Sequence, residues 1–520
     1  MKRVMINIDQ DRGVIAPELH GQFIEFLGSC IYDGIWVGED SDIPNYEGLR
    51  KDIVDGLREL EPPIIRWPGG CYADTYHWRS GIGKREERPV TYNENFGTFE
   101  IDTNQFGTHE FMKLCQMVGA KPWLNINMLS GSVAEMREWM EYCNRKEATT
   151  LSKERAANGS KEAFDVEYWG IGNEVWGGGG TMTPESYALE YRKYATAFPS
   201  FASPDTSFTE PSVMKRIASG PDGNKPKERV AWTKAFFQEM AKYRQPVVDA
   251  YDLHFYNWNL KPSGQSELEF NEAEWYEVID SCFELEDVIK EQYKLVQEGL
   301  EAYPETEGFF KGPEAKCDLI VGEWGNWHKA AFTNRPALYQ QCTMRDAITT
   351  ALTLDIFHRN AGLVKLACVA QSVNVLNALF LTEGDKCLRT PNYDVFFLYK
   401  EHRGGRVLEI EDVEQSKPGD VYMTASRKLD FISVSLINTN IKESKEIEID
   451  FGTSVVCKKA ECLVGDAPDA YNSFEEPNRV RTQRVAEPKG KESVFKLVLP
   501  AASVSFYRFQ IPKSNENRIF

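Results

Sequence analysis

Two glutamates in this sequence, Glu174 and Glu323, have the surroundings of a pair of catalytic carboxylates. Glu174 follows Asn173 in the segment VEYWGIGNEVWGGGG, and Glu323 lies in CDLIVGEWGNW. In each segment an apolar run precedes the glutamate, as in a buried parallel strand whose carboxyl end carries active-site residues in an α/β barrel. Two carboxylates can cleave a glycosidic bond, because one protonates the leaving oxygen while the other attacks the anomeric carbon. Either glutamate taken alone would equally well cap a helix or form a salt bridge.

Tryptophans flank both glutamates. They are Trp169, Trp176, Trp324 and Trp327. Tryptophan faces stack on sugar rings through apolar contacts, so some of these side chains, Trp176 among them, are expected to bind substrate. Others are expected to pack in the core of the protein.

Three further polar residues lie in segments that are predicted to be strands. Arg66 ends the run IIRW before a Pro-Gly-Gly turn. A guanidinium there can hydrogen-bond a carboxylate and hold it ionised, or it can form a purely structural ion pair. His254 and Tyr256 in LHFYNW are two residues apart, so both side chains are expected to point into the mouth of a barrel. A core histidine with satisfied hydrogen bonds is the alternative interpretation of His254.

The elements that must position these residues are strands alternating with helices between residues 17 and 385. Short apolar runs separated by segments of helical periodicity predict a (β/α)8 barrel. We expect its strands near residues 19–28, 63–70, 120–128, 166–174, 216–221, 251–258, 318–325 and 363–371, of which 216–221 is the shortest. Apolar residues at three- and four-residue steps predict one amphipathic helix from Val278 to Leu300.

The pattern of the chain changes after about residue 390. Segments such as LDFISVSLINTN and VSFYRFQI alternate apolar and polar residues, and no helix is expected there. This pattern predicts an all-β sandwich or jelly roll. The N-terminal run KRVMINID alternates in the same way and is expected to pair into that sheet. The predicted domains are residues 1–16, a strand of the sandwich; residues 17–388, the barrel; and residues 389–520, the rest of the sandwich.

Composition argues against several functional classes. A net charge of −19 over 520 residues argues against nucleic-acid binding, which depends on neutralising phosphates with Lys and Arg. No apolar run resembles a signal peptide or approaches the ~20 residues of a membrane span, so we expect a cytoplasmic protein that does not bind membranes. The eleven cysteines have neither zinc-type spacing nor a dense disulfide framework. We therefore expect no metal ion, and thiols that are reduced and mostly buried.

Beyond these patterns, the chain resembles glycoside hydrolase family 51, the α-L-arabinofuranosidases. The segments that carry the resemblance follow the family's order over nearly the whole chain: HGQFIEFLGSCIYDGIW, RWPGGCYADTYHWRSGIG, NQFGTHEF, WGIGNEVWGGGGTMTPESYA, LHFYNW, GEWGNW, MRDAITTALTLDIFHRNA, AQSVNVLNALFLT and TPNYDVFFLYKEH. The resemblance implies a TIM barrel with a C-terminal jelly roll that the N-terminal strand completes. It also implies retaining chemistry, no cofactor and frequent homo-oligomers.

The resemblance further implies roles for individual residues. Glu174 would be the general acid/base and Glu323 the nucleophile. The residues that would hold the furanose ring and the nucleophile are Glu25, Arg66, Asn173, Tyr256 and Gln371, and Cys71 stands where the family tends to have Asn or Cys. Two positions depart from the family pattern. Gly322 replaces an aspartate before the nucleophile, which could alter the groups that support Glu323, and His328 replaces a tyrosine, which could alter the subsite beyond the scissile bond.

The function expected from the sequence is that of a retaining, exo-acting α-L-arabinofuranosidase whose carboxylates stand ~5–5.5 Å apart. An endo-β-1,4-glucanase or a β-xylosidase is the alternative within the same fold, because barrel loops rather than the scaffold set the substrate. A non-catalytic sugar-binding or scaffold protein is the alternative from another class. The presence of both glutamates, Asn173 and Arg66 argues against it.

Overall fold

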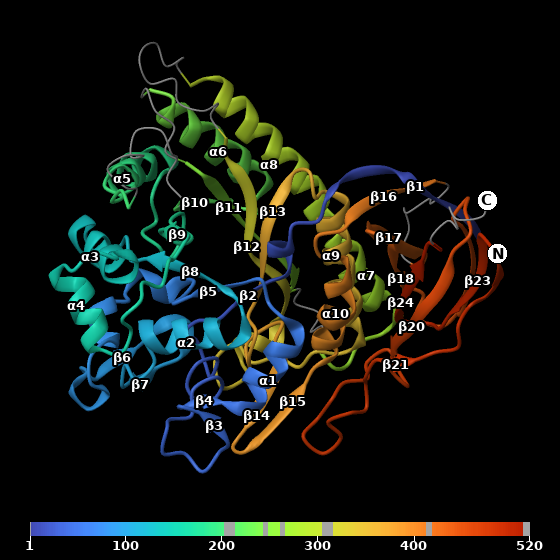
Figure 1. The fold of residues 1–520 in the computed structure, drawn as a ribbon, viewed down its shortest axis with the longest axis horizontal. Helices are drawn as coiled ribbons and strands as arrows, with labels where there is room; N and C mark the ends of the chain where they lie inside the picture. The colour runs from blue at the N-terminus through green and yellow to red at the C-terminus, as the bar shows by residue number, and fades with distance from the viewer. Residues whose placement is uncertain are drawn as a thin grey trace, which may run out of the picture.

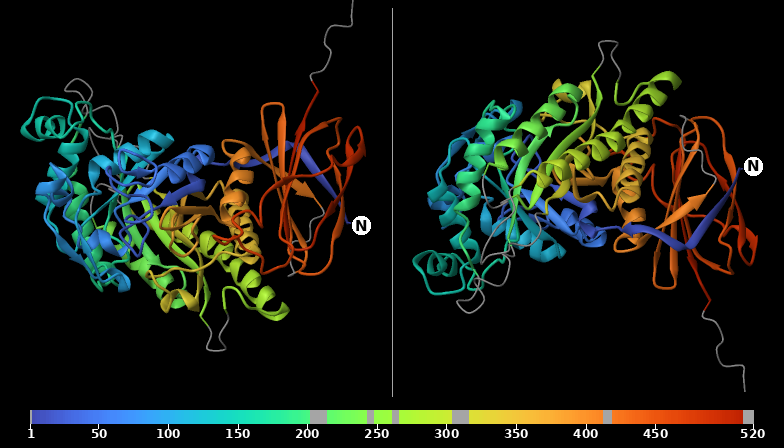
Figure 2. Two further views of the ribbon diagram at one scale, coloured as in Figure 1. Left: turned by 90° about the horizontal axis from the view of Figure 1, so that it is seen from below. Right: turned by 90° about the horizontal axis from the view of Figure 1, so that it is seen from above.

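The computed structural model describes residues 2–201, 214–242, 248–260, 266–303, 316–411 and 419–512. Two regions lie side by side: a closed parallel barrel surrounded by helices, and a large β-sheet that contains both the N-terminal strand and the last strands of the chain (Figure 1). Two further views show the same separation (Figure 2). The predicted TIM barrel with a C-terminal all-β domain is confirmed.

Eight strands form the barrel, and each lies at one of the predicted positions. In the order in which they neighbour one another, they are β10 (Lys215–Asp222), β11 (Ala250–Asn259), β12 (Asp318–His328), β13 (Val364–Ala370), β2 (Gly21–Phe23), β5 (Ile64–Trp67), β8 (Lys121–Ile126) and β9 (Tyr168–Ile171). Every neighbouring pair is parallel, so all carboxyl ends meet at one mouth. The strands are buried on both faces, which explains their nearly continuous apolar sequence.

Ten α-helices occur in the described residues. They are α1 (Lys51–Leu60), α2 (Thr108–Val118), α3 (Val133–Asn144), α4 (Thr150–Ala157), α5 (Pro184–Thr196), α6 (Pro226–Met240), α7 (Glu272–Cys282), α8 (Glu284–Glu301), α9 (Met344–Arg359) and α10 (Pro391–Tyr399). Local sequence fixes several starts: Thr183 caps α5 by accepting a hydrogen bond from the Ser186 backbone, and Pro184 occupies the first helical position. No helix among these combines the length and the apolar surface needed to cross a bilayer.

Short elements lie in the loops around the barrel. They are the hairpins β3–β4 (Asn45–Tyr46, Leu49–Arg50), β6–β7 (Thr91–Asn93, Glu100–Asp102) and β14–β15 (Phe380–Glu383, Lys386–Arg389), and the 3-10 turns η1 (Pro17–His20), η2 (Cys71–Asp74), η3 (Trp78–Gly81), η4 (Arg85–Glu87), η5 (Asn95–Gly97), η6 (Lys329–Phe332) and η7 (Lys400–His402).

One predicted helix is two helices in the structure. The segment from Val278 to Leu300 is divided between α7 and α8, which meet at Phe283. There the Phe283 N–H bonds the carbonyl of Asp280, three residues back, so the chain makes a tighter 3-10-type turn. Phe283 keeps right-handed helical dihedral angles (φ −73°, ψ −17°), so the apolar period continues across the junction. The prediction of a single helix was wrong for this reason.

The second region is a ten-stranded sheet in the order β21-β20-β24-β18-β17-β16-β1-β19-β23-β22. Its strands are β1 (Lys2–Val14), β16 (Arg406–Glu411), β17 (Val421–Lys428), β18 (Phe431–Asn438), β19 (Lys445–Asp450), β20 (Val456–Val464), β21 (Gln483–Arg484), β22 (Lys489–Lys491), β23 (Val494–Leu499) and β24 (Ser503–Gln510). β1 lies between β16 and β19, antiparallel to the first and parallel to the second. The predicted pairing of the N-terminal run with this sheet is confirmed. The sheet has its own apolar core, to which Val4 and Ile6 of β1 contribute.

The segment after residue 390 contains a helix where none was expected. Residues 391–399 form α10, which lies beside α9 (Figure 1) and also contacts α1. Nearly every residue of α10 is buried, so the segment lacks the amphipathic period by which a surface helix is recognised. We propose that the barrel continues through α10 and that the sheet domain begins at β16, rather than at residue 389.

Candidate active site

The two predicted catalytic carboxylates meet at the mouth of the barrel. Glu174 lies in the turn after β9 with a φ of 41°, and Glu323 lies within β12. One carboxylate oxygen of each residue and a ring nitrogen of His254 all lie within 4.8 Å of one another. Retaining glycosidases place their carboxyl groups ~5–5.5 Å apart and inverting enzymes ~6.5–9.5 Å. Oxygens this close place the pair on the short side of this division, that of the retaining enzymes.

The loop after Glu174 turns tightly because of its glycines. The Glu174 carbonyl accepts hydrogen bonds from the backbone of Gly177 at 2.7 Å and of Gly179 at 3.2 Å. A Cβ on Gly179 would lie 1.9 Å from the Asn173 carbonyl oxygen, so no other residue fits there without a backbone shift. The glycine-rich sequence thus lets the chain fold back directly behind the carboxylate.

Glu323 is buried among positive and hydrogen-bonding groups. Arg66 Nη1 donates to its Oε1 at 2.7 Å, the Tyr256 hydroxyl donates to its Oε2 at 2.8 Å, and His254 Nδ1 lies 3.6 Å from that Oε2. Burial alone would raise the pKa of Glu323. The charges of His254 and Arg66, and the hydrogen bonds from Tyr256 and Arg66, outweigh burial and lower this pKa. Glu323 is therefore ionised at neutral pH.

Glu174 has the opposite electrostatic environment. Its Oε1 lies 2.9 Å from His254 Nδ1, and its side chain is partly exposed. Burial raises the pKa of Glu174; the His254 hydrogen bond opposes this, and the charge of Glu323 adds to it, so that the pKa is raised. Two neighbouring carboxyl groups whose pKa values move apart are suited to different roles in acid–base chemistry.

His254 lies between the two glutamates and carries a positive charge. Its Nε2 donates to Asp252 Oδ2 at 3.2 Å. Burial lowers the pKa of this imidazole, but the charges of Glu323 and Asp252 and the hydrogen bonds to Asp252 and Glu174 raise it to about 10. Glu174, His254 and Glu323 are close enough to ligate a metal ion. Ligation requires neutral imidazole, so the raised pKa of His254 disfavours a metal at this site.

Arg66 connects Glu323 to Asn173. Its Nη2 donates to Asn173 Oδ1 at 2.6 Å, and its guanidinium carbon lies 4.5 Å from the ring centroid of Phe23 and 5.0 Å from that of Trp123. Asn173 Nδ2 is buried and has no hydrogen-bond partner among the described residues. Buried polar groups are normally satisfied, so this donor is available to a bound molecule.

Glu25 and Gln371 form a pair at the ends of neighbouring strands. Gln371 Nε2 donates to Glu25 Oε1. Burial and the charge of Glu323 raise the pKa of Glu25 to about 8, although Arg66 and Gln371 oppose the shift. Glu25 Oε2 and Gln371 Oε1 are buried, and neither has a hydrogen-bond partner in the part of the chain that the structure describes. These two oxygens are further contact points for a polyhydroxylated ligand.

Cys71 opens η2 and joins the same group of residues. It is partly buried, and burial followed by the charges of Glu174, Glu25 and Glu323 raises the pKa of its thiol well above the usual value. The thiol is therefore protonated. All eleven cysteines are free, and nine are buried, as predicted.

The predicted tryptophans divide between core and site. Trp169 and Trp324 are 0% and 1% exposed and pack against core rings such as Trp139 and Phe357. Trp176 is partly buried against the barrel core, and its role in sugar binding stays a prediction.

Trp327 instead belongs to an aromatic cluster beside Glu323. Its ring centroid lies 5.0 Å from that of Tyr256 and 5.0 Å from that of Trp258, on which it stacks. Phe96 and Phe332 contact the same indole at 5.7 and 5.4 Å. Trp258 is 39% exposed, so it presents a ring to solvent beside the hydrogen-bond partner of Glu323.

Sequence reasoning missed Asp252 and Trp258. Both lie on β11, and both have the same parity as His254 and Tyr256, which were predicted. Extending the alternation by one step in each direction along YDLHFYNW would have found them.

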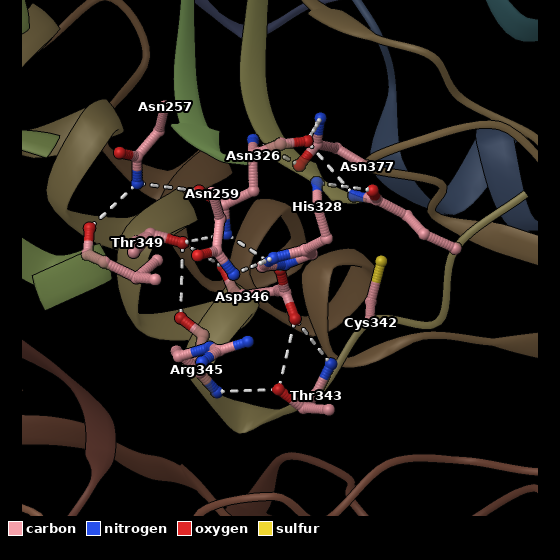
Figure 3. A network of polar contacts seen from close by, with 12 residues as sticks. Asn257, Asn259, Asn326, His328, Cys342, Thr343, Arg345, Asp346, Thr349 and Asn377 are labelled. Atoms are coloured by element: carbon pink, nitrogen blue, oxygen red, sulfur yellow. Dashed lines mark hydrogen bonds and ion pairs between the residues drawn. The ribbon is translucent and has the colours of Figure 1, made fainter. Parts of the chain in front are cut away.

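His328 does not face a subsite, contrary to expectation. Its side chain is fully buried; Nε2 contacts Asp346 Oδ1 at 2.8 Å, and Nδ1 contacts Asn259 Nδ2 at 2.8 Å (Figure 3). Burial would raise the pKa of Asp346, but His328, Arg345 and the Thr343 N–H lower it to about 2. His328 thus ties the end of β12 to the start of α9.

The same network continues toward the segment that carries Gln371. Asn326 Nδ2 donates to Asp346 Oδ1 at 2.7 Å, and the Asn326 backbone exchanges hydrogen bonds with the side chain of Asn377 at 2.7 and 3.1 Å (Figure 3). Asn377 Nδ2 also donates to the Ala370 carbonyl at 2.8 Å. The network therefore fixes the ends of β12 and β13 relative to each other.

Comparisons with known proteins agree with this geometry. Residues 56–273 match the family model of the α-L-arabinofuranosidase 1 domain, and residues 322–503 match that of the α-L-arabinofuranosidase C-terminal domain. The intracellular exo-α-L-arabinofuranosidase of Bacteroides ovatus is 38% identical over 515 residues, covering 96% of this chain and 94% of the relative. The probable α-L-arabinofuranosidase C of Aspergillus clavatus is 27% identical over 480 residues, which is 88% of each chain.

Solved structures give the same result. The crystal structure of the family 51 arabinofuranosidase from Xanthomonas axonopodis pv. citri superposes with a TM-score of 0.87 at 31% identity, covering 98% of this chain and 99% of that one. The bifunctional glucanase-xylanase CelM2 shares the fold, with a TM-score of 0.59 at 12% identity over 98% and 99% of the two chains. With this identity and coverage, and with the two glutamates facing each other across His254, the chain belongs to glycoside hydrolase family 51, the α-L-arabinofuranosidases.

Proposed function

We propose that this chain is a retaining, exo-acting α-L-arabinofuranosidase that releases terminal L-arabinofuranose from arabino-oligosaccharides or hemicellulose fragments. The observation that carries the proposal is the pair Glu174 and Glu323, close together, with pKa values shifted in opposite directions. Such a pair fits a double displacement through a covalent intermediate. The name of the Bacteroides ovatus relative, an exo-α-L-arabinofuranosidase, supports the same assignment.

In the first step ionised Glu323 attacks the anomeric carbon. The bond from that carbon to the leaving oxygen breaks, and the proton of Glu174 passes to the leaving oxygen. In the second step ionised Glu174 takes a proton from water, whose oxygen replaces Glu323 at the anomeric carbon. Two inversions leave the configuration of the sugar unchanged.

The buried polar groups around Glu323 support binding of a terminal sugar. The unpartnered atoms Asn173 Nδ2, Glu25 Oε2 and Gln371 Oε1 offer one donor and two hydrogen-bonding oxygens, and Cys71 lies near them. Glu25, Asn173 and Gln371 are buried, which suits a ring that enters end-on rather than a polymer that passes through. The aromatic cluster of Trp258 and Trp327 would receive the leaving-group sugar, since aromatic faces stack on sugar rings.

Assay against p-nitrophenyl α-L-arabinofuranoside, β-D-xyloside and β-D-cellobioside tests the substrate class. We expect turnover of the arabinofuranoside, with methanol transglycosylation giving a methyl arabinofuranoside of retained configuration by NMR. Preferential turnover of the xyloside or cellobioside would favour the endo-glucanase or β-xylosidase alternative, for which the fold of CelM2 is the supporting observation. Absence of turnover with every substrate would favour the non-catalytic alternative.

We also propose a cytoplasmic location and a homo-oligomeric state. The first is supported by the name of the Bacteroides ovatus relative, which calls that protein intracellular. The second is supported by exposed apolar side chains on and next to hairpin β6–β7: Val90, Tyr92, Phe99 and Ile101 are 66%, 57%, 58% and 67% exposed. Cell fractionation tests the location. Light scattering of the purified chain, with Ile101→Lys as a variant expected to dissociate, tests the oligomer.

A further inference from the structure

A β-bulge lies in β12 immediately before Glu323. Strands β11 and β12 pair in parallel, and their register shifts by one residue between the pair Leu253–Val321 and the pair His254–Glu323. Gly322 is therefore the extra residue. A bulge takes one residue out of the regular ladder, bends the strand and changes the direction of neighbouring side chains. The direction of the Glu323 side chain therefore depends on the contacts that fix this bulge.

Side chains of the site hold both backbone groups of Gly322. Its N–H donates to Asp252 Oδ1 at 2.6 Å, and its carbonyl accepts from Arg66 Nη1 at 3.2 Å. Asp252 is 6% exposed, and its Oδ2 accepts from Nε2 of His254 at 3.2 Å. The Asp252 carboxylate therefore contacts both the bulge at Gly322 and the His254 ring, which in turn contacts both glutamates.

This arrangement requires glycine at position 322. A Cβ on Gly322 would lie 2.4 Å from each carboxylate oxygen of Asp252. The carboxylate of Asp252 thus occupies the space that a side chain at position 322 would need. Gly322 departs from the aspartate of the family pattern, and in this chain the carboxylate beside it comes from Asp252 on the neighbouring strand, β11.

We propose that Asp252 is a positioning residue, which clamps the Gly322 bulge so that Glu323 faces the anomeric carbon and which keeps His254 charged between the two glutamates. The inference rests on the proposed roles of Glu174 and Glu323. Asp252 acts only through its neighbours and touches no reacting atom.

The charge of Asp252 should appear in the pH dependence of the reaction. Besides Asp252, the charged groups that interact with His254 are Asp222 of β10, Glu174 after β9 and Glu323 of β12. Arg66 of β5 interacts in turn with Glu323 and Asp252. A negative charge raises the pKa of every acid near it, so removing Asp252 lowers the pKa values of His254 and of both glutamates. Both limbs of the pH profile should then move to lower pH.

Asp252→Asn tests the charge. The amide oxygen can still accept the Gly322 N–H, so the bulge keeps its partner. The amide nitrogen then faces His254 Nε2 in place of Oδ2, so the ring loses both the negative charge and the acceptor that favour its protonated form. We expect kcat/KM for an aryl arabinofuranoside to keep a bell-shaped profile whose alkaline limb moves down by about one pH unit. Asp249→Asn is the matched control, because Asp249 pairs with Arg216 at the other end of the barrel, and its profile should stay in place. An equal loss of rate at every pH with unmoved limbs would overturn the proposal.

A double-mutant cycle tests the clamp without substrate. Gly322→Ala should lower the thermal midpoint because its Cβ meets Asp252, and Asp252→Ser should relieve that contact. We expect the double variant to lose less stability than the sum of the two single losses. Additive losses would reject the contact. Because the cycle is measured by unfolding, it remains decisive even if the chain failed to hydrolyse arabinofuranosides, a result that would reject the proposed function instead.

Discussion

The His254 ring lies 2.9 Å from Glu174 through the same Nδ1 atom that lies 3.6 Å from Glu323. A single imidazolium thus stabilises negative charge on either carboxylate, whichever carries it at a given step. The protonation states of the three groups are linked, so the pKa values that a pH profile reports belong to the set rather than to one residue. The roles of the two glutamates are best separated by chemistry rather than by titration.

The two glutamates should differ in their dependence on the leaving group. A nucleophile is needed for every substrate, whereas a general acid matters only when the leaving group is poor. Glu323→Ala should therefore be inactive on all substrates. Glu174→Ala should form the glycosyl-enzyme from a dinitrophenyl arabinofuranoside and then stall, and azide should release an arabinosyl azide of retained configuration. If azide rescued Glu323→Ala with inversion instead, the two roles would be exchanged.

Removal of the Tyr256 hydroxyl should shift the acid limb of the pH profile. The hydroxyl donates to Glu323 at 2.8 Å and helps to lower the pKa of that carboxyl group. In Tyr256→Phe this pKa rises, so the nucleophile becomes protonated at a higher pH and the acid limb of kcat/KM moves to higher pH. We also expect a fall in kcat of about tenfold, from the loss of a hydrogen bond to a charged group. An acid limb at the same pH as in the unmodified enzyme would contradict this role.

The barrel could be predicted from the sequence because each of its strands is a short apolar run. In the segments between the strands, apolar residues recur with the helical period of three to four positions. Even the six-residue run 216–221 coincides with a strand, β10. The break between α7 and α8 at Phe283 could not be predicted from the sequence. Phe283 keeps helical dihedral angles, so the apolar period continues across the junction. Helix α10 was missed because it is buried on nearly all sides, which removes the amphipathic signal.

The site was predictable where chemistry depends on residue type and not where it depends on register. Glu174 and Glu323 were found as carboxylates after apolar runs. The contact between Asp252 and Gly322 depends on a one-residue bulge in β12, and no local sequence pattern reports how two distant strands are aligned. His328 was expected to affect a subsite because it replaces a tyrosine of the family pattern, whereas its side chain points into the protein toward Asp346.

Trp258 should contribute to binding of the leaving-group sugar. Its ring stacks on Trp327 at 5.0 Å and is 39% exposed beside Tyr256. Trp258→Ala should lower kcat/KM for arabinotriose by about tenfold, the upper end of an aromatic stacking contribution, and less for a p-nitrophenyl glycoside whose leaving group needs no positioning. Trp258→Phe should keep most of the kcat/KM for arabinotriose that Trp258→Ala loses, because phenylalanine also presents an aromatic face. Equal losses on both substrates would show that the ring acts on the sugar at the catalytic centre or on the fold.

Three buried histidines should make the fold sensitive to acid. His20 Nε2 lies 2.9 Å from His358 Nε2, and the rings of His358 and His402 have centroids 5.2 Å apart. Burial holds the pKa values of His20 and His358 well below 6.5. The charge of Arg403 adds to this effect at His20, and the two other histidines add to it at His358. Burial lowers the pKa of His402 to about 3. Only the unfolded chain takes up these protons near its ordinary pKa of 6.5. The contribution of the three neutral histidines to the free energy of unfolding is therefore fully present above pH 6.5 and is lost as the pH falls below it.

Denaturant unfolding over a pH series measures this effect. Each histidine that stays neutral only in the folded state should cost about 1.4 kcal/mol per pH unit below pH 6. Two buried carboxyl groups act in the opposite direction: burial raises the pKa of Asp355 to about 7 and that of Glu25 to about 8. As the pH falls toward their ordinary pKa values, each offsets about one of the three histidines, because the folded state holds its proton more tightly. His402→Gln retains a group that can bond Ser426 and Ser435 but cannot be protonated. The variant should be less stable at pH 7.5 and should lose less stability between pH 6 and 4. An unchanged slope would show that His402 does not contribute to the acid sensitivity.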